Sequence, residues 1–278
     1  SRQTSLYLAS SEADLGSLQR EYECRAQHGF DVTLLTANDL AQTGSLPAPG
    51  AIRSAGDAQI NPLRFTRELL ERARTQGLRA FGGCDVKLII PDAEGVVLAT
   101  ESAKVTARRV VVATGYAAHQ LLKKDLGSLH STYAAASAPL SSFEGWPEQC
   151  LLWETARPYF YLRSTPDGRA IIGGGDTRFS TDHQRDGLVA DKIDRLRQRF
   201  ETMFPQIPFE PEFAWAGTFA ETKDGLAYIG ESPELPHAYF ALGYGGNGIT
   251  FSVIAARIIA DLFVRRPNFD AQIFRFDR

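Results

Sequence analysis

The spacing of hydrophobic and polar residues over the first forty positions predicts strands and helices in turn. Leu6 to Ala9 and Val32 to Leu35 are short apolar runs, typical of strands. Between them, Glu12 to His28 has apolar residues at helical spacing and is followed by Gly29, a common residue after a helix end. Thr36 to Leu40 is expected to begin a short second helix.

A longer helix is predicted from Pro62 to about Gln76. Asn61 can cap this helix with its side-chain oxygen. Pro62 suits the first helical position because the N–H that proline lacks would have no partner there. Gly77 is expected to end the helix.

From Gly83 to Val105 the period of the pattern changes to two residues. The runs "DVKLII", "GVVLAT" and "AKVTA" predict a three-stranded meander, with Val86 in its first strand as an expected core residue. The next segment, "RRVVVATGY", is apolar on both faces. This pattern predicts a buried central strand, which is usually parallel to its neighbours.

The second half of the chain combines strands with two further helices. Residues 131 to 176 are rich in strand formers and aromatic residues, and Asp186 to Met203 is a charged amphipathic helix. Ala238 to Leu242 has the pattern of another buried strand, followed by a helix from Ile249 to Phe263. Buried strands near 110 and 238 bracket an antiparallel middle. We therefore expect two domains, with the chain crossing between them more than once.

Composition excludes several classes of partner. Among 278 residues, 44% are hydrophobic and 23% charged, and the net charge of -3 is spread along the chain without a basic block. Nucleic acids and anionic membrane surfaces are therefore not expected partners. No apolar run reaches the ~18 residues that span a bilayer, and no signal peptide is recognisable. The first residue is Ser1, and the chain opens directly into a strand, so a fragment is expected.

Cysteine and histidine usage favours a metal-free cytoplasmic protein. Cys24, Cys84 and Cys150 are odd in number and far apart, which predicts reduced thiols that pack in the interior. The five histidines form no pair at helical spacing and no cluster with acidic or cysteine neighbours. A zinc site is therefore not expected.

The segment "FALGYGGNGITFS" poses a question of its own. Gly243, Gly245 and Gly248 fit the dinucleotide pattern G-x-G-x-x-G, which should be followed by a second strand and an acidic residue about 20 positions on. Only 30 residues follow Gly248, and Pro267 interrupts them. This segment is thus not a Rossmann loop. Either it presents N–H groups to an electron-rich oxygen or an anion, or it is a tight turn.

Other short motifs also allow two interpretations. "VVVATG" could admit a ligand close to the backbone at Ala113 and Gly115, or could be a strand-to-helix turn. "TKDGLAYIG" carries a strong turn sequence before an apolar strand and favours a hairpin. Tyr159, Tyr161 and Arg163 alternate with apolar residues, so that they share one face of a strand. That face either lines a polar pocket or is solvated.

Taken in order, these segments resemble one family. "SLYLAS", "INPLRFTRELLERARTQG", "VVVATG", "YLRSTPDGRAIIGGGD", "TKDGLAYIG" and "YFALGYGGNGITFSVIAARIIADLF" are similar to the FAD-dependent amine and amino-acid oxidoreductases of the D-amino-acid oxidase, glycine oxidase and sarcosine oxidase group. The resemblance implies an α/β (α+β) fold. It combines an FAD-binding Rossmann-like domain, here without the family's own first G-x-G-x-x-G segment, with an antiparallel substrate domain.

The resemblance also implies domain boundaries and a cofactor site. The FAD-binding domain is expected at 61–116 and 217–268, and the substrate domain at 1–60 and 117–216. The residues from Gly243 to Thr250, called the glycine-rich loop below, then meet the pyrimidine edge of the flavin. This edge becomes negative when the flavin is reduced. The expected cofactor-binding residues are Val86, Ala113, Thr114, Gly115, Gly217, Gly243, Gly245, Gly246, Asn247, Gly248, Ile249 and Thr250.

Two positions depart from the relatives in ways that concern the flavin and the substrate. Gly217 stands where sarcosine oxidases carry the cysteine that links to flavin, so non-covalent FAD is expected. Phe219 stands where glycine oxidases carry an arginine that clamps the substrate carboxylate. The expected pocket residues are therefore Tyr159, Tyr161, Arg163 and Phe219.

The resemblance implies oxidation of a C–N bond in an amine or amino acid, by hydride transfer to flavin N5. The imine product hydrolyses in water, and oxygen or another carrier reoxidises the flavin. The alternative is a non-catalytic fragment or subunit of such a flavoprotein that serves as a binding scaffold.

Overall fold

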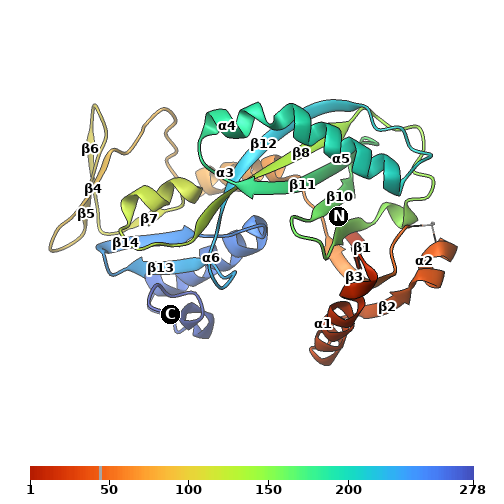
Figure 1. Cartoon of the computed structure of the whole chain (residues 1–278). Helices are drawn as coiled ribbons and strands as arrows, with labels where there is room; N and C mark the ends of the chain where they lie inside the picture. Colours follow the sequence, from red (N-terminus) through yellow and green to blue (C-terminus); the bar gives the residue numbers. More distant parts are fainter. Residues whose placement is uncertain (44–45) are drawn as a thin grey trace. The chain divides into compact units, whose positions relative to one another are not determined.

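The computed structural model describes residues 1–43 and 46–278, which divide into two compact units (Figure 1). Unit 1 contains Ser1–Ile60 and Ser131–Gly217, and unit 2 contains Asn61–His130 and Thr218–Arg278. The assignment of one unit to the cofactor and the other to the substrate stays a prediction.

Unit 1 is built on a sheet of eight strands in the order β12-β8-β11-β10-β9-β1-β3-β2. The pairings of β1 with β3, β2 with β3, β9 with β10 and β10 with β11 are antiparallel, whereas β1 and β9 are parallel. Strands β8 and β12 continue into unit 2. The strands are β1 (Arg2–Leu8), β2 (Val32–Thr36), β3 (Gly50–Ala58), β8 (Ser128–Ser137), β9 (Leu151–Glu154), β10 (Phe160–Ser164), β11 (Ala170–Arg178) and β12 (Pro211–Glu221).

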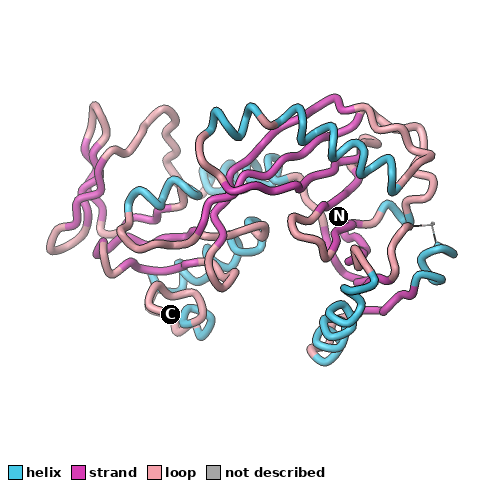
Figure 2. Tube along the Cα trace, in the orientation of Figure 1, coloured by secondary structure: helices cyan, strands magenta, loops and turns pink. Residues whose placement is uncertain are grey.

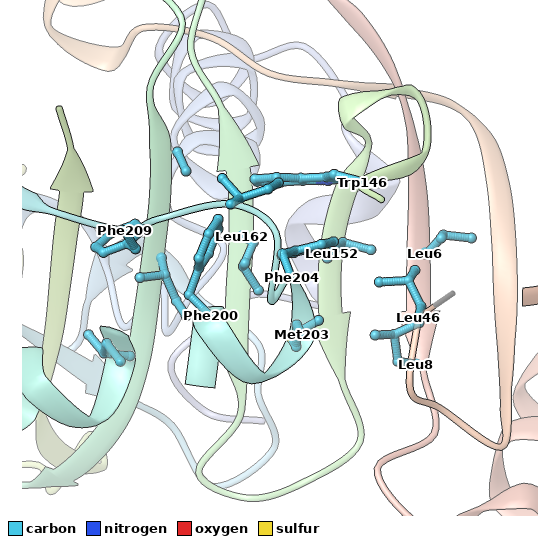
Figure 3. Packing of buried hydrophobic residues seen from close by; sticks show 14 of the residues in the cluster. Leu6, Leu8, Leu46, Trp146, Leu152, Leu162, Phe200, Met203, Phe204 and Phe209 are labelled. Atoms are coloured by element: carbon cyan, nitrogen blue, oxygen red, sulfur yellow. The ribbon is translucent and has the colours of Figure 1, made fainter. Parts of the chain in front are cut away.

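Helix α5 covers one face of this sheet. Its buried residues recur every three or four positions, as one face of a helix requires: Ile193, Leu196, Phe200 and Met203. Figure 3 shows Phe200, Met203 and Phe204 gathered with Trp146, Leu152 and Leu162. The helices of this unit are η1 (Glu12–Asp14), α1 (Leu15–Gln27), α2 (Ala37–Thr43), η3 (Pro147–Gln149), α4 (Asp182–Gly187) and α5 (Val189–Met203).

Unit 2 holds two small sheets of three strands each (Figure 2). One has the order β13-β14-β7, and helix α6 packs against β13 and β14. The other is the predicted antiparallel meander. The elements are α3 (Pro62–Thr75), β4 (Leu88–Pro91), β5 (Val96–Ala99), β6 (Lys104–Ala107), β7 (Val110–Val112), η2 (Gly115–Leu121), β13 (Tyr228–Ser232), β14 (Leu235–Leu242), α6 (Gly248–Phe263) and η4 (Phe269–Gln272).

Strand β7 is parallel to β14, as predicted, but it is not central. It lies at the edge of its sheet, and Val111 is 43% exposed. Val86 likewise lies outside the strand predicted for it and is 45% exposed rather than in the core. An apolar run shows that a segment can be buried, but it does not show how many strands or helices pack against the segment. Both predictions were wrong for this reason.

The first turn of α3 forms as its sequence predicts. Asn61 Oδ1 accepts a hydrogen bond from the backbone N–H of Arg64 at 3.0 Å, and Pro62 is the first helical residue. Residues 117–130, expected with the substrate domain, instead cluster with unit 2. The reason is apolar packing, because Leu122 and Leu126 share a buried cluster with Phe240.

The three cysteines differ in exposure. Cys150 is buried, as predicted, but Cys24 and Cys84 are exposed. Cys24 Sγ lies 3.9 Å from His28 Nδ1, a neighbour that was not expected from the sequence.

Within residues 1–43 and 46–278, no helix has the length and apolar character needed to cross a membrane. The cytoplasmic location stays a prediction.

Candidate functional site

The glycine-rich loop joins β14 to α6 in unit 2. Gly243 and Gly245 have φ angles of +75° and +52°, which side-chain-bearing residues seldom adopt. The N–H of Gly245 donates to the carbonyl oxygen of Ala220 at 2.9 Å, which ties the loop to the end of β12. The loop is therefore a shaped connection, held in place by a neighbouring strand.

The start of α6 is accessible and lacks a side-chain cap. Asn247 occupies the N-cap position, but its side chain makes no capping hydrogen bond, and the first turn carries no acidic residue. Gly246, Asn247, Ile249 and Thr250 are exposed. The N–H groups of the first turn and the positive end of the helix dipole can thus meet an electron-rich oxygen.

A second loop packs beside the first. A β-carbon on Gly243 would stand 2.7 Å from Thr222 Cγ2, so the two loops touch there. Thr222 Oγ1 donates to the carbonyl oxygen of Leu226 at 2.9 Å, and Asp224 Oδ1 accepts from the N–H of Leu226 at 3.1 Å. The predicted turn is present, but the hairpin is not, because β13 pairs with β14 instead of β12.

The C-terminal arginine holds this second loop. Arg278 donates from Nε to Asp224 Oδ2 at 2.8 Å and from Nη2 to the carbonyl oxygen of Leu226 at 2.7 Å. Its guanidinium also lies 3.9 Å from the ring centre of Tyr228. The hydrogen bond from Arg278 keeps the pKa of the Asp224 carboxyl well below its ordinary value.

A cavity of about 410 Å³ lies between β7, β14 and α6. Small residues dominate its walls, including Ala113 and Gly115 at the exposed end of β7. Tyr244 lines it as well, and burial raises the pKa of this phenol, which is hydrogen-bonded to Ser252. Neither Tyr244 nor Ser252 was expected from the sequence. The lining residues are Val111, Ala113, Gly115, Ala241, Tyr244, Ser252, Ala255, Ala256 and Ile259.

Unit 2 contains all of the expected cofactor residues except Gly217. Ala113 and Gly115 line the cavity, Thr114 lies between them, and the glycine-rich loop borders it through Tyr244. Val86 is not among the lining residues. Gly217 falls in unit 1, where a β-carbon would lie 3.8 Å from Thr132 Cγ2, an ordinary contact.

The expected substrate residues of unit 1 share one face of β10. Phe160 and Leu162 pack with the core under α5, so the alternate residues Tyr161 and Arg163 point the other way. Tyr159 precedes the strand, and its ring centre lies 6.1 Å from that of Tyr161. Arg163 Nη1 donates to the carbonyl oxygen of Ile60 at 3.3 Å.

Tyr161 is the most enclosed of these residues. Burial raises the pKa of its phenol, with further contributions from Tyr159 and from the carboxylate of Asp176, while a hydrogen bond with Thr132 acts in the opposite direction. The phenol therefore remains a neutral hydrogen-bonding group across the physiological pH range.

An aromatic row that sequence reasoning missed continues this face. Tyr161 pairs with Trp153 across β10 and β9, and Trp153 pairs with Tyr7 across β9 and β1. The rings of Tyr7 and Trp153 are stacked, with centres 5.8 Å apart. No local pattern reveals this row, because its members come from segments far apart in the sequence.

The remaining expected pocket residue, Phe219, lies in unit 2. Its ring is stacked on that of His130, with centres 5.6 Å apart and an interplanar angle of 25°. His130 was not singled out from the sequence, and its partner on β12 is distant along the chain. The described residues contain no group of three or more His, Cys, Asp or Glu side chains that could hold a metal ion.

Several curated proteins with related sequences are named oxidases or oxidoreductases. Glycine oxidase of Geobacillus kaustophilus (strain HTA426) is 28% identical over 279 residues, covering 98% of this chain and 72% of that protein. Glycine oxidase of Bacillus subtilis (strain 168) is 27% identical over 237 residues, covering 82% of this chain and 61% of that protein. Gamma-glutamylputrescine oxidoreductase of Escherichia coli (strain K12) is 26% identical and covers 92% and 60%, respectively.

Solved structures share the fold. The crystal structure of glycine oxidase from Geobacillus kaustophilus superposes with a TM-score of 0.83 at 24% identity, covering 96% of this chain and 72% of that one. L-proline dehydrogenase from P. horikoshii gives a TM-score of 0.80 at 18% identity, covering 99% and 76%. The predicted mixed α/β fold class is thereby confirmed.

The FAD dependent oxidoreductase family, DAO, matches residues 1–262. This match and the glycine oxidase relatives confirm the predicted resemblance, the oxidoreductase class and FAD as the cofactor, and they do not favour the scaffold alternative. Because the match extends over nearly the whole sequence, the chain belongs to the FAD dependent oxidoreductase family.

Proposed function

We propose that the protein oxidises the C–N bond of an amine or amino acid, with non-covalently bound FAD as the electron acceptor. The observation that carries this proposal is the arrangement inside unit 2. Gly243 touches Thr222, and the adjoining Tyr244 lines the same cavity as Ala113. Two segments far apart in the sequence thus line one cavity beside the start of α6, and a third, at Thr222, packs against the glycine-rich loop.

The residues present fit a flavin at this place. The small side chains of Ala113, Ala255 and Ala256 leave room in the cavity, and Gly115 has a φ angle of +61° that suits a close backbone approach. We propose that the first-turn N–H groups of α6 and the loop Gly243–Gly248 face the electron-rich pyrimidine edge. When bound, FAD supplies the acceptor for the hydride that leaves the substrate carbon.

The backbone N–H groups at the start of α6 stabilise negative charge on a group bound next to them. Backbone N–H groups need no rearrangement to do so, because the helix fixes their direction before reaction. With Asn247 uncharged and no carboxylate in the first turn, nothing in this turn opposes that charge. This electrostatic stabilisation is the contribution that we assign to unit 2.

Unit 1 is proposed to orient the substrate. Tyr161 and Tyr159 supply phenol groups, and Arg163 supplies a cation on the same face of β10. Because hydride transfer requires mainly orientation and a deprotonated amine, these residues need only hold the substrate in place. Oxygen or another carrier is the proposed final acceptor of the electrons.

Phe219 favours a substrate other than glycine. An aromatic ring where relatives carry an arginine provides an apolar wall and no bidentate carboxylate contact. We therefore propose larger or less acidic amines as preferred substrates, which distinguishes this protein from the glycine oxidases to which it is similar.

Anaerobic mixing of the FAD-saturated protein with a panel of amines and amino acids tests the proposal. Bleaching of the visible flavin absorption, with release of the carbonyl product, is the expected result. If no member of a panel of primary, secondary and α-amino-acid amines bleaches the flavin, the proposed function is wrong.

A further inference from the structure

A histidine, a phenylalanine and a glutamate form a compact group on β8 and β12, within unit 2. His130 Nε2 lies 3.6 Å from Glu221 Oε2 and 3.0 Å from Ser128 Oγ. The imidazole is stacked on Phe219, and its side chain is 27% exposed. The ring is therefore held on one nitrogen and on one face, while remaining within reach of a small ligand.

This group is close to the glycine-rich loop. Ala220, between Phe219 and Glu221 in β12, accepts the hydrogen bond from Gly245 N–H at 2.9 Å. On its other side, β12 lies next to β8, which carries His130. Two neighbouring residues of β12 thus connect the imidazole to the loop proposed to face the flavin.

We propose that His130 is a specificity-determining residue whose imidazolium, oriented by Glu221 and backed by Phe219, binds the carboxylate of an amino-acid substrate. The inference rests on the proposed function and concerns one end of the substrate only. In this proposal His130 makes the contact with the substrate carboxylate that the uncharged Phe219 cannot make.

The geometry explains why this contact depends on pH. Nε2 is directed to Glu221 and Ser128, so Nδ1 is the nitrogen left to meet a ligand. In the imidazolium both ring nitrogens carry a proton, so that Nδ1 can donate while Nε2 keeps its partners. Glu221 is the charged group that faces the ring. Arginine would keep its charge throughout, whereas histidine changes charge between about pH 5 and 8.

The test uses two substrates from the panel, an amino acid and the amine that lacks only its carboxylate. Rates of flavin reduction give kcat/KM for each substrate between about pH 5.5 and 8.5. The ratio for amino acid over amine should fall about tenfold as the pH rises, the value of one charge-assisted hydrogen bond. His130→Gln should hold the ratio low and flat, and His183→Gln, at an exposed histidine of α4, should leave the wild-type profile unchanged.

Glu221→Gln separates recognition from structure. Removing the neighbouring carboxylate should loosen the orientation of the ring and lower the amino-acid to amine ratio without abolishing its dependence on pH. If His130 had only a structural role, His130→Gln would change kcat/KM for both substrates alike. The pH profile of the ratio would then be the same as in the wild type. An amino-acid to amine ratio independent of pH in the wild type, or equal in wild type and His130→Gln, would overturn the inference.

A binding measurement keeps the inference testable apart from turnover. In the protein labelled with ¹⁵N-histidine, saturating acetate should shift the imidazole ¹⁵N resonances of His130, because a bound carboxylate changes the hydrogen bonding of Nδ1. Unchanged His130 resonances count against the inference even if amines reduce the flavin. Conversely, failure of every amine to bleach the flavin contradicts the proposed function and leaves the acetate result to decide the role of His130.

Discussion

The ring of Tyr161 lies across Gly173, the residue paired with it on the neighbouring strand β11. A β-carbon on Gly173 would stand 2.2 Å from Tyr161 Cζ and 2.3 Å from its phenol oxygen. No real β-carbon approaches a ring so closely. The phenol of Tyr161 can therefore take this position only because residue 173 is a glycine. Tyr161 reaches its hydrogen bond with Thr132 from this position.

Gly173→Ala should displace the Tyr161 ring and weaken substrate orientation. We expect kcat/KM to fall roughly ten- to a hundredfold, as small misplacements of a positioning group do. The overpacked strand should lose about 1–3 kcal/mol of stability. Reductive half-reaction kinetics and chemical unfolding measure the two effects.

Two variants serve as controls for Gly173→Ala. Gly187→Ala places the same methyl group where no atom lies within 4 Å, and should leave kinetics and stability near wild type. Tyr161→Phe keeps the ring but removes the phenol, and separates the hydrogen bond from the ring's shape. Wild-type kinetics for Gly173→Ala would show that Tyr161 does not orient the substrate.

Phe219→Arg should change substrate preference. A guanidinium at this position can bind a carboxylate through two parallel hydrogen bonds, so kcat/KM for glycine relative to a bulky amine should rise about tenfold. Phe219→Leu, which removes the ring without adding charge, should not improve glycine. Competition between the substrates measures the ratio directly. Glycine or sarcosine as the best substrate of the wild type would contradict the predicted role of Phe219.

Arg278→Gln should loosen the turn that contacts the glycine-rich loop. In the wild type the pKa of Asp224 is lowered mainly by its hydrogen bond from Arg278. This interaction stabilises the folded protein at pH values above the ordinary carboxyl pKa of about 3.9. The stabilisation is lost as the pH falls from that value toward the lowered pKa of the folded state. The variant should therefore show a shallower loss of unfolding free energy below about pH 4.

Urea unfolding at several pH values and hydrogen exchange of the 222–226 turn test this effect. Arg275→Gln is the matched control, because Arg275 forms an exposed ion pair with Asp277 at 3.1 Å near the same end of the chain. Such exposed pairs contribute little. If Arg278→Gln and wild type lose stability in parallel on acidification, the Asp224 interaction does not hold this turn.

Local rules explain which parts of the fold were predictable. The start of α3 follows from Asn61 and Pro62, and α5 follows from an apolar stripe whose spacing suits one face of a helix. Strand β3 was missed because "GAIRSAGDA" consists mostly of small and polar residues, with Ile52 as its one large apolar residue. It is a strand because it pairs with both β1 and β2. Such pairing is a tertiary property.

The same distinction applies to the site. The glycine-rich loop could be recognised because several glycines in a row are costly unless the backbone needs them. His130 could not, because its significance comes from Phe219 and Glu221 on another strand. The sequence also revealed the turn at Asp224 but not its contact with Arg278 at the end of the chain.

We propose that the start of α6 faces the pyrimidine edge of FAD, and this placement can be tested directly. Asn247→Asp places a carboxylate there, on a side chain that makes no capping hydrogen bond in the wild type. Like charges at 4 Å repel by about 1 kcal/mol even in bulk water, and more in a partly dry site. The helix itself should form as well as before, since Asp is a good N-cap residue.

The matched control is Asn61→Asp, the same substitution at the N-cap of α3, where the side chain already caps Arg64 N–H. Spectroelectrochemical titration of the FAD-saturated wild type and both variants is the direct measurement. We predict a lower flavin potential for Asn247→Asp alone. Equal potentials in all three proteins would show that the glycine-rich loop is only a turn.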